Sequence, residues 1–449
     1  MAFDCIRAGL YTEAIVLLGS TRRTLALASK QAVQSNGNAQ SDLPDQNWGA
    51  APLVHYCLGW LYAKLNDPKS SAERYRTAAA LAPDYCFPAR LEEIGILQAA
   101  IQANPNDPLA PYYLGNLLYD RRRHDEAIAL WERAACLGAQ FSVVWRNLGI
   151  GYFNIRRDPQ RGRAAYDKAF CANPWDARLL YERDQLWKRL GVSPAKRLEE
   201  LEVHPNLIQQ RDDLTIELCA VYNQVGRHDK AASLLSSRRF QPWEGGEGGP
   251  LGQHVRTHLA LGRAALAQHD PKSARQHFES ALHAPSNLGE AKHLLANQSD
   301  IHFWLGCACD ALGDKAAARH YWLASATFKG DFQEMSVRTF SEMTYFSALS
   351  LLKLGRKATG CKLLKDLLRY ARALAAAPAK IDYFATSLPT MLLFSDDLQR
   401  RQQTTALFLQ AQGQLGLGNN SAARKLFQAV LRRDPSHALA ADYLRDLQK

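Results

Sequence analysis

The sequence predicts an all-α fold in which short helical hairpins repeat along the chain and stack into a solenoid. One spacing recurs seven times: a small residue, another 12 positions later, a bulky residue 4 positions further, and a small or aliphatic residue 3 beyond that. The chain is 47% apolar but only 9% aromatic, without the alternation of a half-buried strand. Its 449 residues also exceed one ordinary globular core. An open array of repeated helices accounts for all three observations.

The spacing has a physical reason. Small residues on both helices of a hairpin let the two backbones approach, and the bulky residue fills the space between them. The clearest copies begin at Gly59, Gly115, Gly262, Gly306 and Ala411, a weaker one begins at Ala348, and the copy at Gly149 has one extra residue before its second helix. Proline after several copies stops the second helix.

This skeleton resembles the tetratricopeptide repeat (TPR), a helical hairpin of about 34 residues. Each hairpin buries only part of its apolar face, so neighbours must stack. The resemblance implies a right-handed superhelix whose first helices line the concave side.

The first segments depart from the regular array. Residues 1–34 read as a partial N-terminal repeat or cap, because Gly9–Ala14 look like the loop and second helix of a hairpin. We therefore expect the chain to be the C-terminal part of a longer protein. Residues 35–50, rich in Asn, Gln, Ser, Asp and Gly, predict a flexible loop.

The rest divides into two stretches of array and two family-specific segments. Residues 51–237 and 255–381 carry the repeats, with a glycine-rich insertion at 238–254 between them. Residues 382–449 combine a segment without repeat spacing and a closing hairpin or cap.

Composition narrows the class of protein. No stretch is long and apolar enough to span a membrane, and no secretory signal opens the chain. Several of the nine cysteines fall at interior repeat positions, which favours buried free thiols in a reducing cytoplasm; these are Cys57, Cys136, Cys171, Cys219 and Cys309. Cys307 and Cys309 point to different faces of one helix, so we predict no metal site and no cofactor.

The formal charge of +11 raises the question of nucleic acid. The basic residues are dispersed, and short clusters such as Arg121–Arg123 fall at hairpin turns, where they are usually solvated. No RNA-binding motif is present. Acidic protein partners are therefore favoured over nucleic acid.

The repeat positions that face the concave side predict a binding groove. Its aromatic, amide and basic residues suit a peptide or a glycan. The candidates are Tyr112, Asn116, Tyr119, Arg146, Asn147, Phe153, Arg256, Arg263 and Phe303, with Asp300, Tyr345 and Phe408 at equivalent positions.

Two of these amides match the TPR clamp that grips the C-terminal carboxylate of chaperones. Asn116 and Asn147 stand at the matching positions, but Tyr112 replaces the lysine of the clamp. The clamp is incomplete, which disfavours chaperone tails. An alternative is that Asn116 and Asn147 only hydrogen-bond between helices.

Two loops hold the candidates for chemistry: Trp243, Glu244 and Glu247 in one, and Asp396 and Asp397 in the other. Carboxylates could act as acid and base only if folding set them across a cleft. The alternative is structural, with Ser395 and Asp396 as N-caps and Trp243 as an anchor for the insertion. The glycine run lacks the ending of a phosphate loop.

The same loops carry a narrower resemblance. Trp145–Gly149, Arg211–Leu214, Arg239–Gly248 and Asp382–Arg400 look like the repeat-bearing C-terminal half of an uncharacterised microbial family. In that family a β-rich domain of unknown function precedes the repeats and suggests an association with carbohydrate use.

We therefore expect a non-catalytic scaffold that binds a protein or peptide segment, or its own N-terminal domain, along the groove. The alternative is an accessory or catalytic part of a carbohydrate-active enzyme that uses the Trp243 and Asp396 loops.

Overall fold

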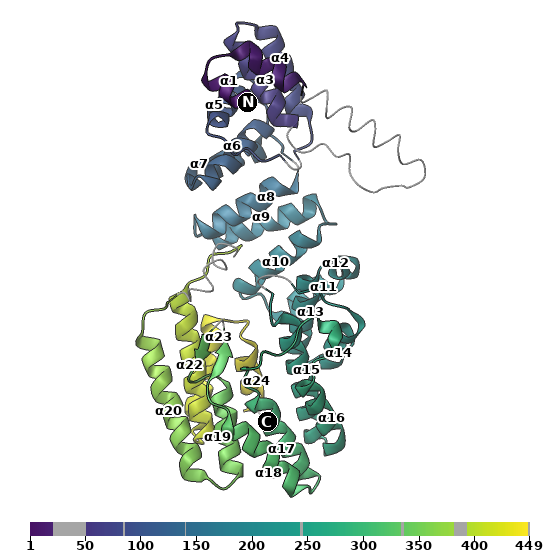
Figure 1. Ribbon diagram of the computed structural model, residues 1–449, viewed down its shortest axis with the longest axis vertical. Coiled ribbons are helices and arrows are strands. Elements are labelled where there is room, and N and C mark those ends of the chain that lie inside the picture. The colour runs from purple at the N-terminus through teal and green to yellow at the C-terminus, as the bar shows by residue number, and fades with distance from the viewer. Residues whose placement is uncertain are drawn as a thin grey trace, which may run out of the picture. The chain divides into compact units, whose positions relative to one another are not determined.

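The computed structural model describes residues 1–20, 51–83, 86–139, 141–242, 246–333, 336–380 and 393–447. The chain forms two compact units, which we call unit 1 (Met1–Asn173) and unit 2 (Pro174–Lys449) (Figure 1). The division falls within the stretch expected as the first part of the array. Trp243 and Glu244 lie outside the described residues.

The described part of unit 1 is helical. Its helices are α1 (Ala2–Arg7), α3 (Ala51–Lys64), α4 (Pro68–Ala80), α5 (Glu92–Ala103), α6 (Leu109–Asp120), α7 (His124–Cys136), α8 (Ser142–Asn154) and α9 (Pro159–Ala172), and residues 11–20 are helical as well.

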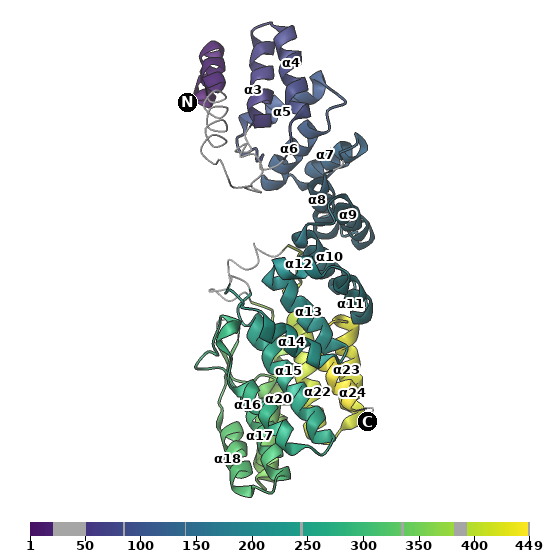
Figure 2. The same cartoon turned by 90° about the vertical axis from the view of Figure 1, so that its right-hand side faces the viewer.

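Unit 2 begins with shorter helices and continues with longer hairpins (Figure 2). Its helices are α10 (Ala177–Arg189), α11 (Pro194–Glu202), α12 (Pro205–Gln210), α13 (Asp212–Gln224), α14 (His228–Ser237), α15 (Gly249–Ala267), α16 (Pro271–Leu282), the 3-10 helix η1 (Ser286–Leu288), α17 (Ser299–Ala311), α18 (Lys315–Thr327), α19 (Met343–Lys353), α20 (Lys357–Ala376), α22 (Leu398–Gly416), α23 (Asn420–Arg433) and α24 (Ala438–Asp446). Helix α15 begins inside the segment that we expected to be an insertion.

The seven spacings fall on seven hairpins, as predicted: α3/α4, α6/α7, α8/α9, α15/α16, α17/α18, α19/α20 and α22/α23. The close approach behind the spacing is also confirmed. A Cβ added at Gly262 would come within 2.3 Å of the Phe278 ring, and one at Gly306 within 2.4 Å of the Trp322 ring. At these two positions a side chain larger than that of glycine would collide with the paired aromatic ring.

Aspartate followed by proline starts the second helix of three hairpins. Asp67, Asp158 and Asp270 each accept a hydrogen bond from the backbone N–H three residues on, at 3.0, 2.9 and 3.1 Å. The proline at the first helical position has no N–H to leave unpaired. This local signal fixes where these second helices begin.

A short β-hairpin interrupts the helices of unit 2, and the sequence did not indicate it. Strands β1 (Asp331–Gln333) and β2 (Ser336–Arg338) are antiparallel, with Asp331 opposite Arg338. Asn297 fastens the hairpin to the preceding loop, since its side chain donates to the Gly330 carbonyl at 2.9 Å and its backbone N–H to Asp331 Oδ1 at 3.0 Å. The repeats themselves remain all-α.

Four buried serines join α17, α18 and α19 through hydrogen bonds. Ser325 Oγ donates to the Ser299 carbonyl and accepts from Ser350 Oγ, both at 2.8 Å. Ser347 Oγ donates to the Ser325 carbonyl at 2.9 Å. Small side chains let these helices lie close together, and their hydroxyls are fully paired with neighbouring groups.

Candidate partner-binding grooves

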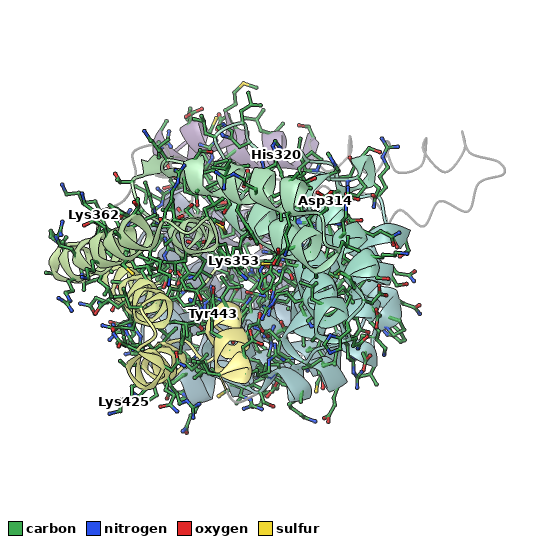
Figure 3. The ribbon with its side chains drawn as sticks, turned by 90° about the horizontal axis from the view of Figure 1, so that it is seen from below. Asp314, His320, Lys353, Lys362, Lys425 and Tyr443 are labelled. Carbon is green, nitrogen blue, oxygen red and sulfur yellow. The ribbon has the colours of Figure 1, made fainter. Side chains whose placement is uncertain are left out.

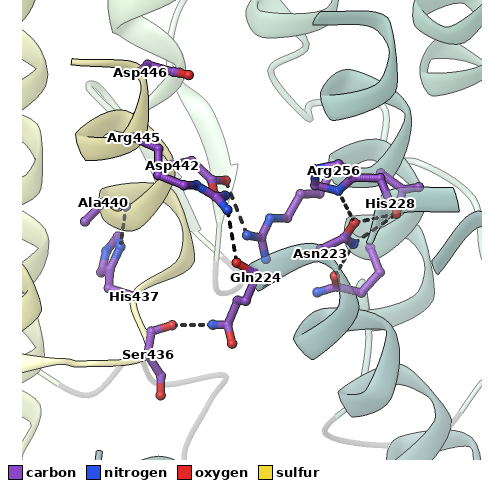
Figure 4. A network of polar contacts seen from close by, with 12 residues as sticks. Asn223, Gln224, His228, Arg256, Ser436, His437, Ala440, Asp442, Arg445 and Asp446 are labelled. Carbon is purple, nitrogen blue, oxygen red and sulfur yellow. Dashed lines mark hydrogen bonds and ion pairs between the residues drawn. The ribbon is translucent and has the colours of Figure 1, made fainter. Parts of the chain in front are cut away.

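In unit 2, α24 lies against α15, whose residues Arg256 and Arg263 we had placed in the groove. Arg256 Nη2 contacts Asp442 Oδ2 at 3.3 Å (Figure 4). Arg263 pairs with Asp446. The Arg256 side chain is only 14% exposed. Burial lowers the pKa of Arg256, and the Asp442 carboxylate opposes that effect. Two arginines on one helix thus meet two aspartates on another.

Polar contacts also tie α24 and its leading loop to α13 and α10. Gln224 Nε2 donates to the Ser436 carbonyl at 2.8 Å, and Arg445 Nη1 donates to the Gln224 carbonyl at 3.2 Å (Figure 4). Ser436 Oγ donates to the Lys188 carbonyl at 3.3 Å. The last two bonds satisfy carbonyls near helix C-termini, which lack partners within their own helices.

Aromatic contacts fix the other side of α24. The Tyr443 ring stacks on Phe427, with centroids 5.0 Å apart and planes at 7°. It meets Tyr345 edge-on at 5.8 Å, and its hydroxyl accepts from Gln412 Nε2 at 3.1 Å. Burial raises the pKa of Tyr443 well above its usual value. In Figure 3, Tyr443 lies inward of Lys362 and Lys425, which mark the outer edge.

The predicted groove residues of unit 2 thus have a partner within the same chain. Arg256, Arg263, Tyr345 and Phe408 all contact α24 or its leading loop, with Phe408 at 5.9 Å from Tyr443 by ring centroids. Phe303 does not offer a groove surface, because it is 6% exposed and packs against Trp304 and Phe346. That part of the expectation is corrected.

In unit 1, Asn116 and Asn147 are bonded to one another across neighbouring repeats. Asn116 Oδ1 accepts from Asn147 Nδ2 and from Trp131 Nε1, both at 3.0 Å. The alternative of an interhelical hydrogen bond is therefore present. Within the described chain, Asn116 Nδ2 and Asn147 Oδ1 make no hydrogen bond, and both side chains are half-buried. One donor and one acceptor stay available for a ligand.

The aromatic residues of the unit 1 groove differ in exposure. Tyr112 is 5% exposed, because Phe141 covers it at a ring distance of 4.7 Å, so it is not available as a groove residue. Tyr119 is half-buried against Trp131 at 5.1 Å, and burial raises the pKa of its hydroxyl. Arg146 and Phe153 are half-buried as well. The partly exposed groove residues of unit 1 are Asn116, Tyr119, Arg146, Asn147 and Phe153.

The carboxylates of the second candidate loop have structural partners. Asp397 is the N-cap of α22, accepting from the Arg400 N–H at 2.9 Å, and Asp396 pairs with Arg401 at 3.1 Å. The cap is thus Asp397, whereas we had expected Ser395 and Asp396. Glu247 is exposed before α15.

The glycine-rich segment is anchored by residues that sequence reasoning missed. Phe240 is 1% exposed, and its N–H donates to the Asn287 carbonyl at 2.8 Å. The Glu290 carboxylate accepts from the N–H groups of Gly248 and Leu251, each at 2.7 Å, at the start of α15. An acidic side chain at a helix N-terminus is favoured by the helix dipole. The sequence did not indicate this contact, because Glu290 lies far along the chain from the start of α15.

A buried charge cluster joins α10, α11 and α13. Arg197 is fully buried and donates to Asp184 at 2.9 and 2.6 Å and to Glu217 at 2.5 Å. Lys188 also pairs with Glu217, at 2.9 Å. Burial alone would raise the pKa of Glu217, but the charges of Lys188 and Arg197 lower it to about 2. The cluster neutralises itself and holds the three helices together.

Asp300 and Lys292 are two further perturbed groups near the groove. Burial raises the pKa of Asp300 to about 6 and lowers that of Lys292 to about 8. Lys292 Nζ donates to the Ala281 carbonyl at 2.7 Å, at the end of α16. Asp300 accepts from the Ile301 N–H at 2.8 Å.

The nine cysteines are all free thiols. Cys57, Cys219 and Cys309 are buried, whereas Cys136 and Cys171 are exposed, contrary to the expectation of interior positions. In the described ranges, no three His, Cys, Asp or Glu side chains gather closely enough to hold a metal ion. No helix in the described part of the chain combines the length and apolarity needed to cross a bilayer.

Stacked helical hairpins define a helical-repeat protein. The chain carries tetratricopeptide repeats: the sequence model of that family matches residues 94–141, 259–334 and 408–444.

The solved structures that this chain is similar to are distant in sequence. YrrB, described as a TPR protein with an unusual peptide-binding site, is 16% identical, and the match covers 50% of this chain and 96% of YrrB, with a TM-score of 0.32. A chain of the Naa15/Naa10 structure bound to HypK-THB is 12% identical, and the match covers 88% of this chain and 66% of that one, with a TM-score of 0.37. PilF of Pseudomonas aeruginosa is 14% identical, and the match covers 49% of this chain and 91% of PilF, with a TM-score of 0.29.

Proposed function

We propose that this chain is a non-catalytic scaffold that binds a protein or peptide segment along the grooves of its repeats. The supporting observation is the way α24 is bound within the chain. Groove residues on α15, α19 and α22 contact this helical segment through ion pairs and ring contacts. A surface that holds one helix in this way has the chemistry to bind a protein segment. The segment could belong to another protein or to the N-terminal domain implied by the family resemblance.

The binding mechanism is preorganisation. In unit 1, the bond between Asn147 and Asn116 and the packing of Tyr119 on Trp131 fix the groove side chains before a ligand arrives. A ligand then loses its own freedom but orders little of the protein. The unpaired amide groups of Asn116 and Asn147 can bond the backbone of an extended segment, and Arg146 adds a positive charge. The free thiols fit a reducing compartment, so we place the protein in the cytoplasm.

The carbohydrate-enzyme alternative gains no support from the described residues. Asp396 and Asp397 are engaged by Arg401 and the Arg400 backbone at the start of α22. A hydrolysis screen with the purified chain tests this alternative directly.

Selection from a displayed peptide library tests the scaffold function. The full chain is the bait, and each enriched peptide is remade and titrated against the chain by calorimetry. A triple variant, Asn116→Ala, Arg146→Ala and Asn147→Ala, checks the unit 1 groove, and Lys425→Ala on the outer edge of α23 is the matched control. We expect saturable binding that the triple variant loses and the control keeps, with both variants folded by circular dichroism. No saturable peptide, or binding unaffected by the groove changes, contradicts the proposal.

A further inference from the structure

Helix α24 packs on α22 and α23 through Ala440, Tyr443, Leu444 and Leu447, and its acidic face meets α15. Among its nine residues, Ala440 is the fully buried one. Isolated helices of this length are marginal in water, since about 12 to 15 residues are needed for stability. Its attachment therefore depends on this apolar packing together with the ion pairs of Asp442 and Asp446 with α15.

The surface on α15 requires an anion opposite it. Arg256 is 14% exposed, and its Nε has no hydrogen-bond partner within the described chain. A guanidinium withdrawn from water is costly unless a carboxylate faces it. In this structure Asp442 supplies that carboxylate, and Asp446 supplies the second one to Arg263. Charge, as well as shape, defines what this surface accepts.

The occupant also presents an aromatic ring and a cation in fixed register. Tyr443 directly follows Asp442 and reaches Phe427 and Tyr345, while Arg445 reaches the Gln224 carbonyl. Asp442 and Asp446 are one turn apart, so both face α15. The recognised pattern is thus Asp-Tyr-x-x-Asp on a helix.

We propose that the unit 2 surface formed by α15 with α13, α19 and α23 is a docking site for an acidic helix of the pattern Asp-Tyr-x-x-Asp, which α24 fills within the chain and a partner protein's helix fills after α24 has moved away. The proposal rests on the scaffold function and names the class of partner for this groove. The positive net charge of the chain, +11, favours such a partner at long range as well.

A helix of the same chain that fills the site lowers the apparent affinity for any partner helix. A segment on a short tether competes at an effective concentration of about millimolar. The apparent affinity for a partner falls in proportion to the fraction of chains in which α24 is released. Releasing α24 therefore strengthens binding of an outside helix without changing the site.

The test uses the full chain with α24 unlocked by Asp442→Asn and Asp446→Asn, which remove the charges and keep the shape. The probe is a fluorescein-labelled synthetic peptide of residues 434–447, and its binding is followed by anisotropy. We expect the unlocked chain to bind the probe at least about tenfold more tightly than the wild type. A peptide carrying the same two asparagines is the matched control and should not bind.

Charge reversal places the site on α15. Arg256→Glu with Arg263→Glu repels α24 and should bind the natural probe no better than background. A probe with Asp442→Arg and Asp446→Arg should bind this reversed chain and not the unlocked one. Natural probe bound equally by the reversed and unlocked chains overturns the assignment to α15.

Hydrogen exchange of the wild-type chain keeps the test decisive even if a variant misfolds. Amides of α24 should exchange at least about tenfold faster than those of α22, because α24 opens locally. Equal protection of α24 and α22, or a folded unlocked chain that binds the probe no better than the wild type, makes α24 a permanent cap and ends the proposal. A wild-type dimer abolished by the reversed charges would show that the occupant is a second copy, and the partner assigned here would be wrong. Failure here leaves the unit 1 groove, tested by the peptide library, untouched.

Discussion

Asp442 of α24 contacts Arg256 of α15 at 3.3 Å, across 186 positions of sequence. The pair is mostly shielded from water, with exposures of 14% for the Arg256 side chain and 21% for that of Asp442. This contact, with that of Arg263 and Asp446, joins α15 to a helix made much later.

Asp442→Asn should lower the free energy of unfolding of unit 2 by about 1 to 3 kcal/mol, because the Arg256 guanidinium keeps its burial and loses its carboxylate. Urea unfolding followed by circular dichroism measures the change. A double-mutant cycle with Arg256→Met isolates the coupling between the two residues. Additive effects of the two substitutions would show that the pair contributes nothing.

Asp300→Asn should stabilise the protein at pH 7. The pKa of the Asp300 carboxyl is about 6 in the folded chain against an ordinary value of 3.8, so its ionisation opposes folding. This cost is absent below about pH 3, grows as the pH rises from the ordinary pKa of 3.8 to the folded value of about 6, and is complete above about pH 7. The variant should be more stable by about 1 to 3 kcal/mol at pH 7 and equal to the wild type at about pH 3. Thermal melts at both pH values check this, and a difference that grows on acidification would contradict it.

Gly262→Ala should destabilise unit 2 by about 1 to 3 kcal/mol, because the new methyl would stand 2.3 Å from the buried Phe278 ring. Gly252→Ala on the same helix is the matched control, since nothing lies within 4 Å of its Cβ position. The control should be neutral or stabilising by up to about 1 kcal/mol from helix propensity. Melting temperatures compare the two, and equal values would refute the close-packing argument.

Thiol labelling should divide the cysteines by burial. Cys136 and Cys171 are exposed and should react within the mixing phase of a disulfide reagent at pH 8. Cys219 is buried, and burial raises its pKa to about 12, so it should react only when urea unfolds the chain. Mass spectrometry of the labelled peptides identifies the sites. Fast labelling of Cys219 in the native chain would be inconsistent with this packing.

The repeats could be predicted from the sequence because their cause is local. The distance from Gly262 to Phe278 is fixed within one hairpin, so the spacing alone implies the contact. Aspartate before proline marks the helix starts for the same reason.

The groove was predicted less well, since exposure depends on neighbouring hairpins. Tyr112 stands at a concave position, but Phe141 from the next hairpin covers it. The occupation of the unit 2 groove could not be predicted at all, because one sequence does not say which of many aspartates will meet Arg256. The β-hairpin after α18 was missed because two three-residue strands carry too little pattern.

The contact between α24 and α15 also has a consequence for biosynthesis. A ribosome completes α15 long before it reaches Asp442, so the arginine face is finished while its own helix does not yet exist. Until α24 is made, an acidic helix from another molecule meets no rival for Arg256 and Arg263, and the ring contacts of Tyr345 and Phe427 are added as α19 and α23 form. Assembly during translation would therefore favour partners already waiting at the nascent chain, and release of α24 would matter only for those that arrive later.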